Sequence, residues 1–333
     1  MSSNINIDNI CRLPPPIDII NLYPNIYTAQ IDKYRTEISN IIHDRDPRKL
    51  IIVGPCSIHD IIAAKEYAIK LKQISTDLPN LYIVMRTYFE KPRTTIGWKG
   101  LINDPKLDCS YDIVEGLKLA REFLLYCAEI QLPCACEFLD TISPQWLADL
   151  VSFGAIGART TECQLHRELV SGLSMPVGFK NGTSGDTQIA VDAVSACQSR
   201  HVFLGIDDRG FPSIIHTKGN NNSCVILRGG KDGPNYYSNN VKTVQQQLLD
   251  ADVSSNIIID CSHGNSQKIF KMQIEIASYA ITLEDICGLM IESFITEGSQ
   301  QICGDLVYGQ SITDACISLQ DTESLLIKLN LQL

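Results

Sequence analysis

A cysteine and a histidine follow an apolar run near the start of the chain, in the stretch LIIVGPCSIHD at 50–60. A thiolate and an imidazole three positions apart are typical metal ligands. A zinc knuckle needs a second ligand pair, however, and no C-x-x-C or H-x-x-x-H motif lies nearby. Cys56 and His59 therefore leave three interpretations open: ligands of a metal site completed from elsewhere in the chain, half of a disulfide, or ordinary packing.

Residues capable of chemistry also end the other short apolar runs. In chain order, the eight runs end at or near Cys56, Arg86, Glu137, Arg159, Lys180, Arg228, His263 and Glu292. Four of these are Lys or Arg, where roughly two are expected by chance once the uncertainty of each strand boundary is allowed for. Any one cation alone is better explained by pairing with a loop carboxylate. Four together indicate a pocket for an anion, because Arg forks around phosphate or carboxylate and Lys adds a point charge.

The remaining strand ends offer a different set of donors. Cys56, His263 and Glu292, with Asp314 in the later stretch YGQSITDACI, supply sulfur, nitrogen and oxygen ligands. Such a mixture favours a divalent transition metal (Mn, Fe, Co or Zn) over Ca or Mg. Each residue alone has a more ordinary explanation in packing or hydrogen bonding. Cys134 and Cys136 point to one face of a predicted strand, and we interpret that face as apolar packing, with metal binding as the alternative.

The elements that must position these residues alternate regularly after about residue 46. Eight runs rich in Val, Ile and Phe are separated by amphipathic stretches with helical spacing. The runs lie at 50–54, 82–86, 134–138, 155–159, 177–180, 224–228, 256–263 and 288–293. Continuously apolar strands are typical of a parallel sheet covered by helices, so the pattern predicts an α/β fold, a (β/α)8 TIM barrel. An open doubly wound sheet is the alternative, but GPCSIHD is not the glycine-rich turn that it would need.

Two segments do not fit this repeat. Residues 1–45, with their Pro14–Pro16 run, predict an N-terminal extension outside the 46–333 barrel. Residues 201–217 place two short apolar runs around Asp207 to Gly210, which predicts a β-hairpin inserted between the fifth and sixth barrel strands.

Composition narrows the class of protein. The net charge of -10 and pI of about 5.1 argue against nucleic acid and anionic membranes as partners. No apolar run approaches the roughly 18 residues of a membrane span. The 13 cysteines are odd in number and scattered, and no hydrophobic signal segment precedes them. These features predict a reduced, cytoplasmic protein.

Long blocks of the chain resemble a known family. The segments VGPCSIHD, EKPRTTIGWKG, VGFKNGT, VILRGGKDGPNY, DCSHGNSQK, GLMIESFITEG and GQSITDACI together resemble type I 3-deoxy-D-arabino-heptulosonate 7-phosphate (DAHP) synthase, over nearly the whole chain from about Leu13. The resemblance implies the first step of the shikimate pathway, towards chorismate and the aromatic amino acids. In that step, phosphoenolpyruvate condenses with erythrose 4-phosphate and water to give DAHP and phosphate. The resemblance also implies a homodimer or homotetramer.

The resemblance implies roles for particular residues. The metal ligands would be Cys56, His263, Glu292 and Asp314. Phosphoenolpyruvate would be held by Arg86, Lys91, Arg159, Lys180 and Arg228, and the phosphate of the sugar by Arg93 and Thr94. The catalytic group would comprise Lys91 as proton donor, with Glu137 or the Cys56 and His263 side of the metal site positioning the water.

In this family the extension and the inserted hairpin form an allosteric site for an aromatic amino acid. The residues that would form it here are Asp140, Gln145, Leu169, Leu173, Ser174, Phe203 and Gly205. Gly205 matches the tyrosine-sensitive form, since the phenylalanine-sensitive form has Ser there.

Two other functions remain open from the sequence. One is the related barrel enzyme 3-deoxy-manno-octulosonate 8-phosphate synthase, which uses arabinose 5-phosphate; the KPRTTIGWKG block argues against it. The other is a catalytically silent regulatory protein, since a fold alone does not establish activity.

Overall fold

A closed barrel of eight parallel strands forms the centre of the molecule. The computed structural model describes residues 4–333, and the strand order around the barrel is β1, β10, β9, β8, β5, β4, β3, β2. The bounds are β1 (Lys49–Gly54), β2 (Leu81–Arg86), β3 (Cys134–Glu137), β4 (Phe153–Ile156), β5 (Val177–Lys180), β8 (Ser223–Leu227), β9 (Ile257–Asp260) and β10 (Ile286–Glu292). The predicted (β/α)8 architecture is confirmed, and the open sheet is excluded. Three strands end early, so Arg159, Arg228 and His263 lie in loops rather than on strands.

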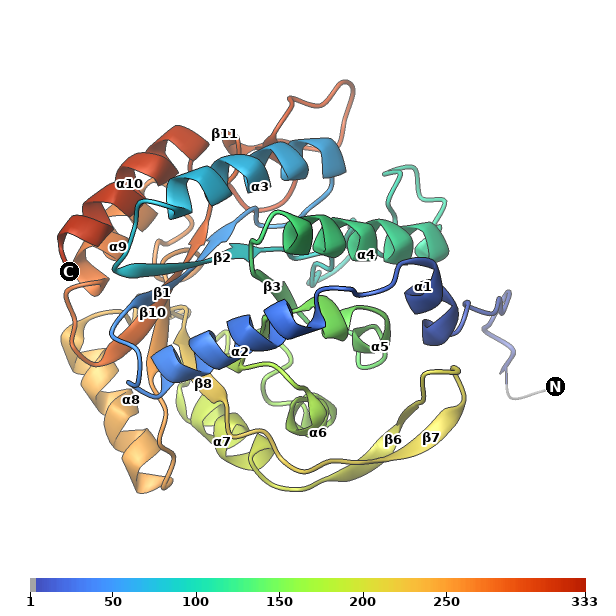
Figure 1. The fold of residues 1–333 in the computed structure, drawn as a ribbon, viewed down its shortest axis with the longest axis horizontal. Coiled ribbons are helices and arrows are strands. Elements are labelled where there is room, and N and C mark those ends of the chain that lie inside the picture. Colours follow the sequence, from blue (N-terminus) through green and yellow to red (C-terminus); the bar gives the residue numbers. More distant parts are fainter. Residues whose placement is uncertain (1–3) are drawn as a thin grey trace.

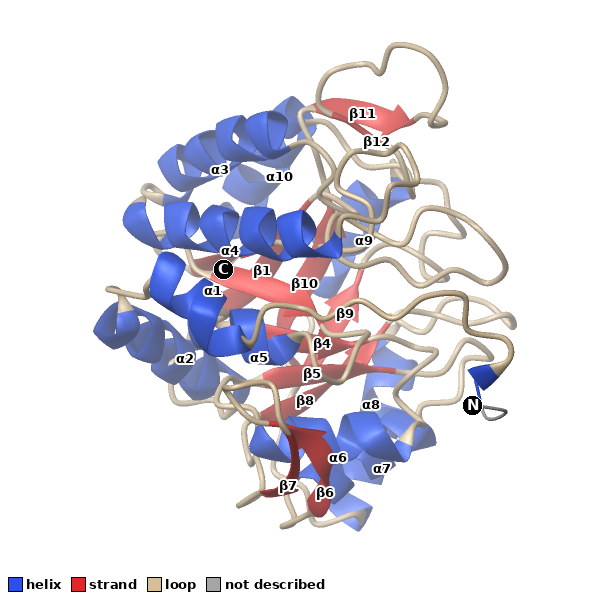
Figure 2. Ribbon diagram, turned by 90° about the vertical axis from the view of Figure 1, so that its right-hand side faces the viewer, coloured by secondary structure: helices blue, strands red, loops and turns tan. Residues whose placement is uncertain are grey.

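Helices surround this barrel (Figure 1). They are α3 (Ile61–Ser75), α4 (Ile113–Glu129), α5 (Pro144–Leu147) continued by the 3-10 turn η2 (Ala148–Leu150), α6 (Gln164–Gly172), α7 (Gln188–Cys197), α8 (Ser238–Asp250), α9 (Met272–Ala280) and α10 (Leu319–Leu331). Asp60 caps α3 by accepting hydrogen bonds from the backbone N–H groups of Ile62 and Ala63. Figure 2 shows the long loops gathered at one end of the barrel. Within residues 4–333, no helix is both long and apolar enough to cross a membrane.

Alternation along the strands divides the core into two layers. On β1, Ile51 and Val53 belong to the large layer shared with the surrounding helices. Leu50 and Ile52 instead face the barrel interior, where Ile38 and Ile42 of α2 (Thr28–Ile42) join them. The second half of the 1–45 segment therefore folds as a helix whose apolar face packs on the barrel core.

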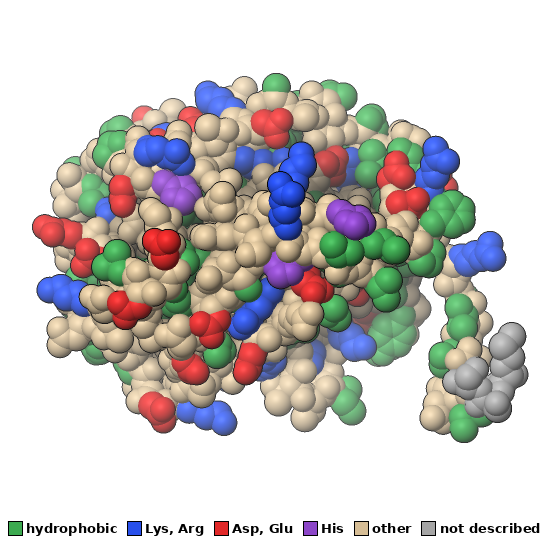
Figure 3. Space-filling view, turned by 90° about the horizontal axis from the view of Figure 1, so that it is seen from below, with side chains coloured by type: hydrophobic (Ala, Val, Ile, Leu, Met, Phe, Trp, Pro, Cys, Tyr) green, Lys and Arg blue, Asp and Glu red, His purple; other side chains and the backbone are tan. Residues whose placement is uncertain are grey.

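The predicted hairpin is present between β5 and β8. Its strands β6 (Val202–Ile206) and β7 (Pro212–His216) pair antiparallel, with Leu204 opposite Ile214. The hairpin exposes apolar side chains, namely Val202, Leu204, Phe211 and Ile214. Figure 3 views the molecule from below, and apolar side chains gather there on the side from which the N-terminal residues project.

The N-terminal segment joins the hairpin to α5. Ile17, in α1 (Pro16–Leu22), donates its backbone N–H to the Asp208 carbonyl in the hairpin turn, at 2.8 Å. The indole N–H of Trp146 in α5 donates to the Pro14 carbonyl at 3.2 Å. A further pair of short strands, β11 (Thr296–Ser299) and β12 (Gln310–Ser311), lies in the excursion between β10 and α10.

Candidate active site

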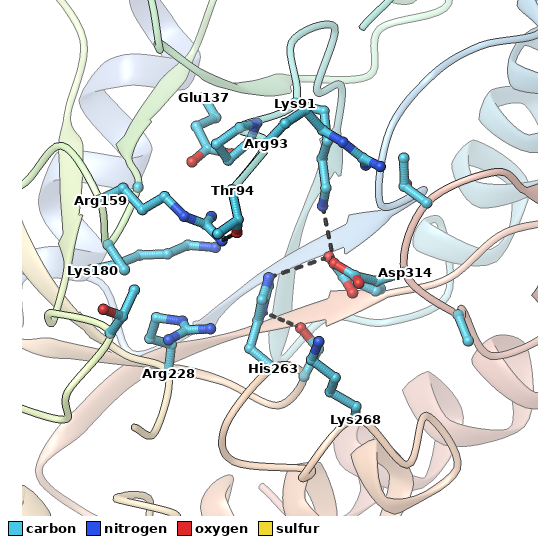
Figure 4. Close-up of a pocket in the computed structure, with 18 of the residues that line it drawn as sticks. Lys91, Arg93, Thr94, Glu137, Arg159, Lys180, Arg228, His263, Lys268 and Asp314 are labelled. Atoms are coloured by element: carbon cyan, nitrogen blue, oxygen red, sulfur yellow. Dashed lines mark hydrogen bonds and ion pairs between the residues drawn. The ribbon is translucent and has the colours of Figure 1, made fainter. Parts of the chain in front are cut away.

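A cavity of about 530 Å³ gathers the predicted substrate and metal residues. Its walls include Arg86, Lys91, Arg93, Thr94, Glu137, Arg159, Lys180, Arg228, His263, Glu292 and Asp314. Cys56, the remaining predicted member, is fully buried beside the cavity. Figure 4 shows the labelled cations and the side chains of His263 and Asp314 converging from different strands and loops. The structure therefore brings together residues that are up to 258 positions apart in sequence, as Cys56 and Asp314 are.

Three of the cations in this cavity are already ion-paired. Arg86 Nη2 lies 2.9 Å from Glu292 Oε1, Lys180 Nζ lies 3.0 Å from Asp260 Oδ2, and Lys91 Nζ lies 3.1 Å from Asp314 Oδ2. Arg86 and Lys180 are two of the four strand-end cations, so for these two the ordinary explanation, pairing with a carboxylate, applies. A buried charge without a partner is costly, so the fold supplies a carboxylate for each cation that it buries deeply.

Other cations in the cavity have no such partner. Within residues 4–333, no carboxylate lies within 4 Å of Arg93, Arg159, Arg228 or Lys268. Arg159 Nη2 donates a 3.0 Å hydrogen bond to Thr94 Oγ1, so the two predicted substrate regions meet at this point. Four cations around one cavity without carboxylate partners make a site suited to a multiply charged anion.

Arg86 is held in a fixed orientation beneath the cavity. Its guanidinium donates to the carbonyls of Pro55 and Cys56 and lies 3.6 Å from the centre of the Tyr88 ring. Burial alone would lower the pKa of Arg86, but the neighbouring groups, Tyr88 and Glu292 foremost, raise it. Arg86 therefore stays charged although it is only 1% exposed.

The candidate metal ligands occupy the opposite side of the cavity. Donor atoms of Cys56, Glu292 and Asp314 lie within 4.8 Å of one another, a spacing that could hold a metal ion. His263 is outside that group of three, but its Nε2 is 3.8 Å from Glu292 Oε1. One thiol, two carboxylates and an adjacent imidazole form a mixed donor set of the kind that transition metals prefer.

The hydrogen bond of His263 Nδ1 leaves a lone pair on Nε2, the ring nitrogen that faces these ligands. Ser262 Oγ donates to Asp260 Oδ1 at 2.8 Å, which leaves that hydroxyl oxygen to accept from His263 Nδ1 at 2.5 Å. The proton on Nδ1 makes Nε2 an acceptor. Nε2 and the Glu292 carboxylate then face each other as two electron donors, an arrangement that a cation between them would stabilise. The residues present therefore fit a divalent metal.

The backbone of His263 and the pKa shifts of its neighbours support the interpretation that these residues fit a divalent metal. His263 has a left-handed backbone with φ of 58°, uncommon for a residue with a side chain and often found at functional sites. Burial, followed by the charge of Glu292, raises the pKa of Cys56 to about 11. Lys91 lowers the pKa of Asp314 below its usual range. Cys56 is thus a neutral thiol at pH 7 and would lose its proton on binding a metal.

Two glycines allow the side chains of Glu137 and Arg93 to lie close to the backbone. A Cβ on Gly157 would lie 2.2 Å from Glu137 Oε1, and a Cβ on Gly97 would lie 2.6 Å from the Arg93 guanidinium. Glu137 itself is largely buried at the cavity wall. Side chains at either glycine would displace Glu137 or Arg93, so close backbone approach is part of how this site is built.

The interpretations left open for the cysteines are now resolved. His59 does not share the candidate metal group; its ring packs edge-on against Phe294 with centroids 6.1 Å apart. Cys134 and Cys136 are both buried in the apolar layer between strands and helices, as expected. All 13 cysteines are free, which excludes a disulfide at Cys56.

The predicted effector residues come from three elements near the hairpin. Asp140 precedes α5 and accepts hydrogen bonds from the backbone N–H groups of Ile142 and Ser143. Gln145 is exposed on α5, Leu169 is buried on α6, and Leu173 and Ser174 follow α6 directly. Phe203 and Gly205 lie on β6 and are partly buried. The structure places these elements near one another, and effector binding among them stays a prediction.

Sequence reasoning missed several residues of the site. Asp260 contacts both Lys180 and His263, although it stands in the same NIIIDCSH run that indicated His263. Ser57 and Thr313, each next to a candidate ligand, are joined by a 2.7 Å hydroxyl hydrogen bond. Lys268 points into the cavity from the loop after β9 (Figure 4). Asp260 was detectable as a carboxylate ending an apolar run, whereas a serine or threonine beside a ligand carries no such signal.

The fold and the site define an α/β-barrel protein with a cationic pocket beside a candidate transition-metal site. The chain belongs to the DAHP synthetase I family, which matches residues 27–327. The earlier resemblance is therefore confirmed at the level of the family.

Individual relatives agree. Phospho-2-dehydro-3-deoxyheptonate aldolase, Phe-sensitive, of Escherichia coli strain K12 is 48% identical over 338 residues, which cover 98% of this chain and 96% of that protein. The Trp-sensitive protein of the same strain is 48% identical over 320 residues, covering 92% and 90%. A solved structure of phospho-2-dehydro-3-deoxyheptonate aldolase from Francisella tularensis SCHU S4 superposes with a TM-score of 0.96 at 48% identity, covering 98% of each chain. These relatives are named for phenylalanine or tryptophan, so the tyrosine preference stays a prediction.

Proposed function

We propose that the protein condenses phosphoenolpyruvate with erythrose 4-phosphate and water to give DAHP and inorganic phosphate, the first step of the shikimate pathway. The observation that carries the proposal is a set of cations, Arg93, Arg159, Arg228 and Lys268, that have no carboxylate partner within residues 4–333 and surround one cavity beside the Cys56, Glu292 and Asp314 donors. Two phosphorylated substrates need such an excess of cations, and membership of the family supplies the reaction.

Phosphoenolpyruvate carries a carboxylate and a phosphate a few bonds apart, and the cationic wall suits both groups. In the proposal, Arg86, Lys91, Arg159, Lys180 and Arg228 bind it and direct C3 towards the second substrate. Arg86 is fixed by hydrogen bonds to the Pro55 and Cys56 carbonyls, so little rearrangement of this side chain is needed when the ligand arrives. Such preorganisation lowers the barrier by orienting the reacting carbons.

The sugar phosphate would bind at the rim. Arg93 and Thr94 would hold its phosphate, and the Arg159 to Thr94 hydrogen bond links this position with the phosphoenolpyruvate side. The aldehyde end would then lie towards the metal side of the cavity. A tight fit for a four-carbon chain would exclude the five-carbon substrate of the related octulosonate synthase.

Cys56, His263, Glu292 and Asp314 would hold one divalent Mn, Fe, Co or Zn ion. When bound, this metal would act as a Lewis acid on the aldehyde oxygen. Lys91 lies 2.8 Å from Cys56 Sγ and 3.1 Å from Asp314 Oδ2, close enough to this side to deliver a proton to the new alkoxide.

Water must then add at C2 before the phosphate leaves from that carbon. Glu137 borders the cavity on the phosphoenolpyruvate side, and we assign it, or the Cys56 and His263 side, to position that water. The bond formed first joins C3 of phosphoenolpyruvate to the aldehyde carbon; the water oxygen then bonds C2, and inorganic phosphate is released. No external oxidant or reductant is required.

A steady-state assay tests the proposal directly. Phosphoenolpyruvate consumption should occur with erythrose 4-phosphate and be far slower with arabinose 5-phosphate. Preference for the five-carbon sugar would replace the proposed reaction by that of the octulosonate synthase. Absence of turnover with either sugar, in protein shown to bind both a metal and phosphoenolpyruvate, would favour a catalytically silent protein.

Regulation by an aromatic amino acid is a second part of the proposal. The effector would bind among Asp140, Gln145, Leu169, Leu173, Ser174, Phe203 and Gly205, and we expect tyrosine to be preferred. The contacts from Pro14 and Ile17 to α5 and to the hairpin turn support a role for residues 1–45 in forming this region.

We further propose that the protein forms a homodimer or homotetramer. The exposed apolar face of the hairpin, with Leu204 and Ile214 more than half exposed, supports burial against another copy. Free cysteines throughout the chain support a reducing, cytoplasmic location.

A further inference from the structure

Asp260 touches both sides of the active site at once. Its Oδ2 lies 3.0 Å from Lys180 Nζ on the anion side and 3.0 Å from His263 Nδ1 on the metal side. Neither contact has the direction of a good hydrogen bond to Oδ2; the Lys180 ammonium forms an ion pair with this oxygen, and the Nδ1–H of His263 lies beside it. Asp260 is fully buried and Lys180 is 3% exposed, so water screens these contacts very little.

The Lys180 ammonium and the Nδ1–H of His263 therefore compete for the carboxylate of Asp260. The closer Asp260 lies to His263 Nδ1, the more electron-rich Nε2 becomes and the better that nitrogen binds a metal. The closer Asp260 lies to Lys180, the less that ammonium offers to an anion. A metal on Nε2 would polarise the Nδ1 proton and draw the carboxylate towards His263, which would leave Lys180 freer for phosphoenolpyruvate.

We propose that Asp260 is a positioning residue that couples metal binding to phosphoenolpyruvate binding, because it is shared between His263 and Lys180. This inference rests on the proposed function, since it uses the assignments of His263 to the metal and Lys180 to phosphoenolpyruvate. The coupling is reciprocal: each ligand raises the affinity for the other by the same factor.

The first experiment measures that factor. Metal-free protein is titrated with Co²⁺, followed by the absorbance of its thiolate bond, with and without phosphoenolpyruvate and without the sugar. We expect Co²⁺ to bind at least about fivefold more tightly when phosphoenolpyruvate is present. Asp260→Asn should reduce this ratio several-fold. Asp149→Asn, which removes the negative charge from the 2.7 Å pair with buried Arg121, outside the residues that line the cavity, should leave the ratio unchanged.

The second experiment looks for a gain in Co²⁺ affinity, which damage to the structure would not produce. Lys180→Gln frees Asp260 for His263, so Co²⁺ should bind roughly threefold or more tightly than to the wild type in the absence of phosphoenolpyruvate. Arg228→Gln removes a cavity cation that has no carboxylate partner and controls for the general loss of positive charge. The gain from Lys180→Gln should exceed that from Arg228→Gln and should disappear in the Asp260→Asn background.

The outcomes separate the inference from the proposed function. An unchanged ratio in a folded Asp260→Asn protein, or equal gains from Lys180→Gln and Arg228→Gln, would overturn the coupling while leaving the reaction intact. If Asp260→Asn does not fold, the comparison of Lys180→Gln with Arg228→Gln decides alone. A wild-type protein that binds neither Co²⁺ nor phosphoenolpyruvate would overturn the proposed function itself.

Discussion

A single hydroxyl contact joins the two loops that carry Cys56 and Asp314. Ser57 Oγ and Thr313 Oγ1 lie 2.7 Å apart, and Ser57 is fully buried. Between the same two loops, Cys56 Sγ lies 3.7 Å from Asp314 Oδ2. Thr313→Val keeps the shape of the side chain and removes this hydrogen bond. We therefore expect the variant to bind a metal more weakly, because Asp314 is no longer held towards Cys56.

The magnitude follows from the bond. A buried hydrogen bond contributes about 1 kcal/mol net, and a partner left unsatisfied costs about 1–3 kcal/mol. If about 1 kcal/mol of loop ordering is lost, the metal dissociation constant rises roughly fivefold. Thr313→Ser retains the hydroxyl and should restore most of the affinity.

Chelator competition on metal-free protein, with Co²⁺ as the probe, measures this affinity for Ser57→Ala, Thr313→Val and the double variant. The two single effects should not add, because either change breaks the same bond. Ser171 and Thr217 form a matched control, a buried 2.7 Å hydroxyl pair at the far end of α6. Ser171→Ala should lower stability without changing metal affinity. Strictly additive effects of Ser57→Ala and Thr313→Val, or an unchanged affinity, would refute the reasoning.

Three further predictions concern the metal, pH and regulation. Chelation should abolish turnover and added metal should restore it, while Cys56→Ser should weaken Co²⁺ binding; turnover unaffected by chelation contradicts the metal assignment. Burial, then the charge of Asp140, raises the pKa of Glu90 to about 7, so the folded state binds a proton that the unfolded state releases above about pH 4.5. The free energy of unfolding should therefore fall by about 2 kcal/mol between pH 5.5 and pH 8 because of Glu90, as measured by denaturant unfolding, and Glu90→Gln should lack this fall. An equal fall in both proteins would rule out the linkage to Glu90. Tyrosine should inhibit more than phenylalanine or tryptophan, and Gly205→Ser, whose Cβ would lie 2.8 Å from Ile215 Cγ1, should weaken that preference; insensitivity to all three removes the effector assignment.

The barrel was predictable because each of its strands is apolar on both faces. Ile51 and Ile52 of β1 face opposite layers of the core, and both are completely buried. The sequence of this strand is therefore continuously apolar and does not alternate between apolar and polar residues. Strand ends were less predictable. Arg159 and Arg228 directly follow apolar runs, and His263 follows Asp260 by three positions, yet nothing in these residue types shows where backbone pairing stops.

The gathering of the candidate site residues around one cavity was predictable, but which of them pair with one another was less so. Strand-end position brought the cations and ligands together in the prediction, because parallel strands of a barrel deliver their carboxyl ends to one side. Which cation pairs with which carboxylate depends on side-chain direction, and Arg86 with Glu292 joins residues 206 positions apart. Ser57 and Thr313 were invisible for a related reason, since a hydroxyl pair is recognisable only once both loops are in place.

The ion pairs explain how a protein of net charge -10 maintains a cationic pocket. Glu292 Oε1 lies 2.9 Å from Arg86 and 3.8 Å from His263, and Asp260 Oδ2 lies 3.0 Å from both Lys180 and His263. Each carboxylate therefore stands between one cation that we propose binds phosphoenolpyruvate and the candidate metal ligands. Without ligands, these pairs neutralise charges that would be costly to bury alone. In the proposed coupling, a metal held by these residues would draw the carboxylates, and a phosphorylated anion would then replace them as the partner of the cations.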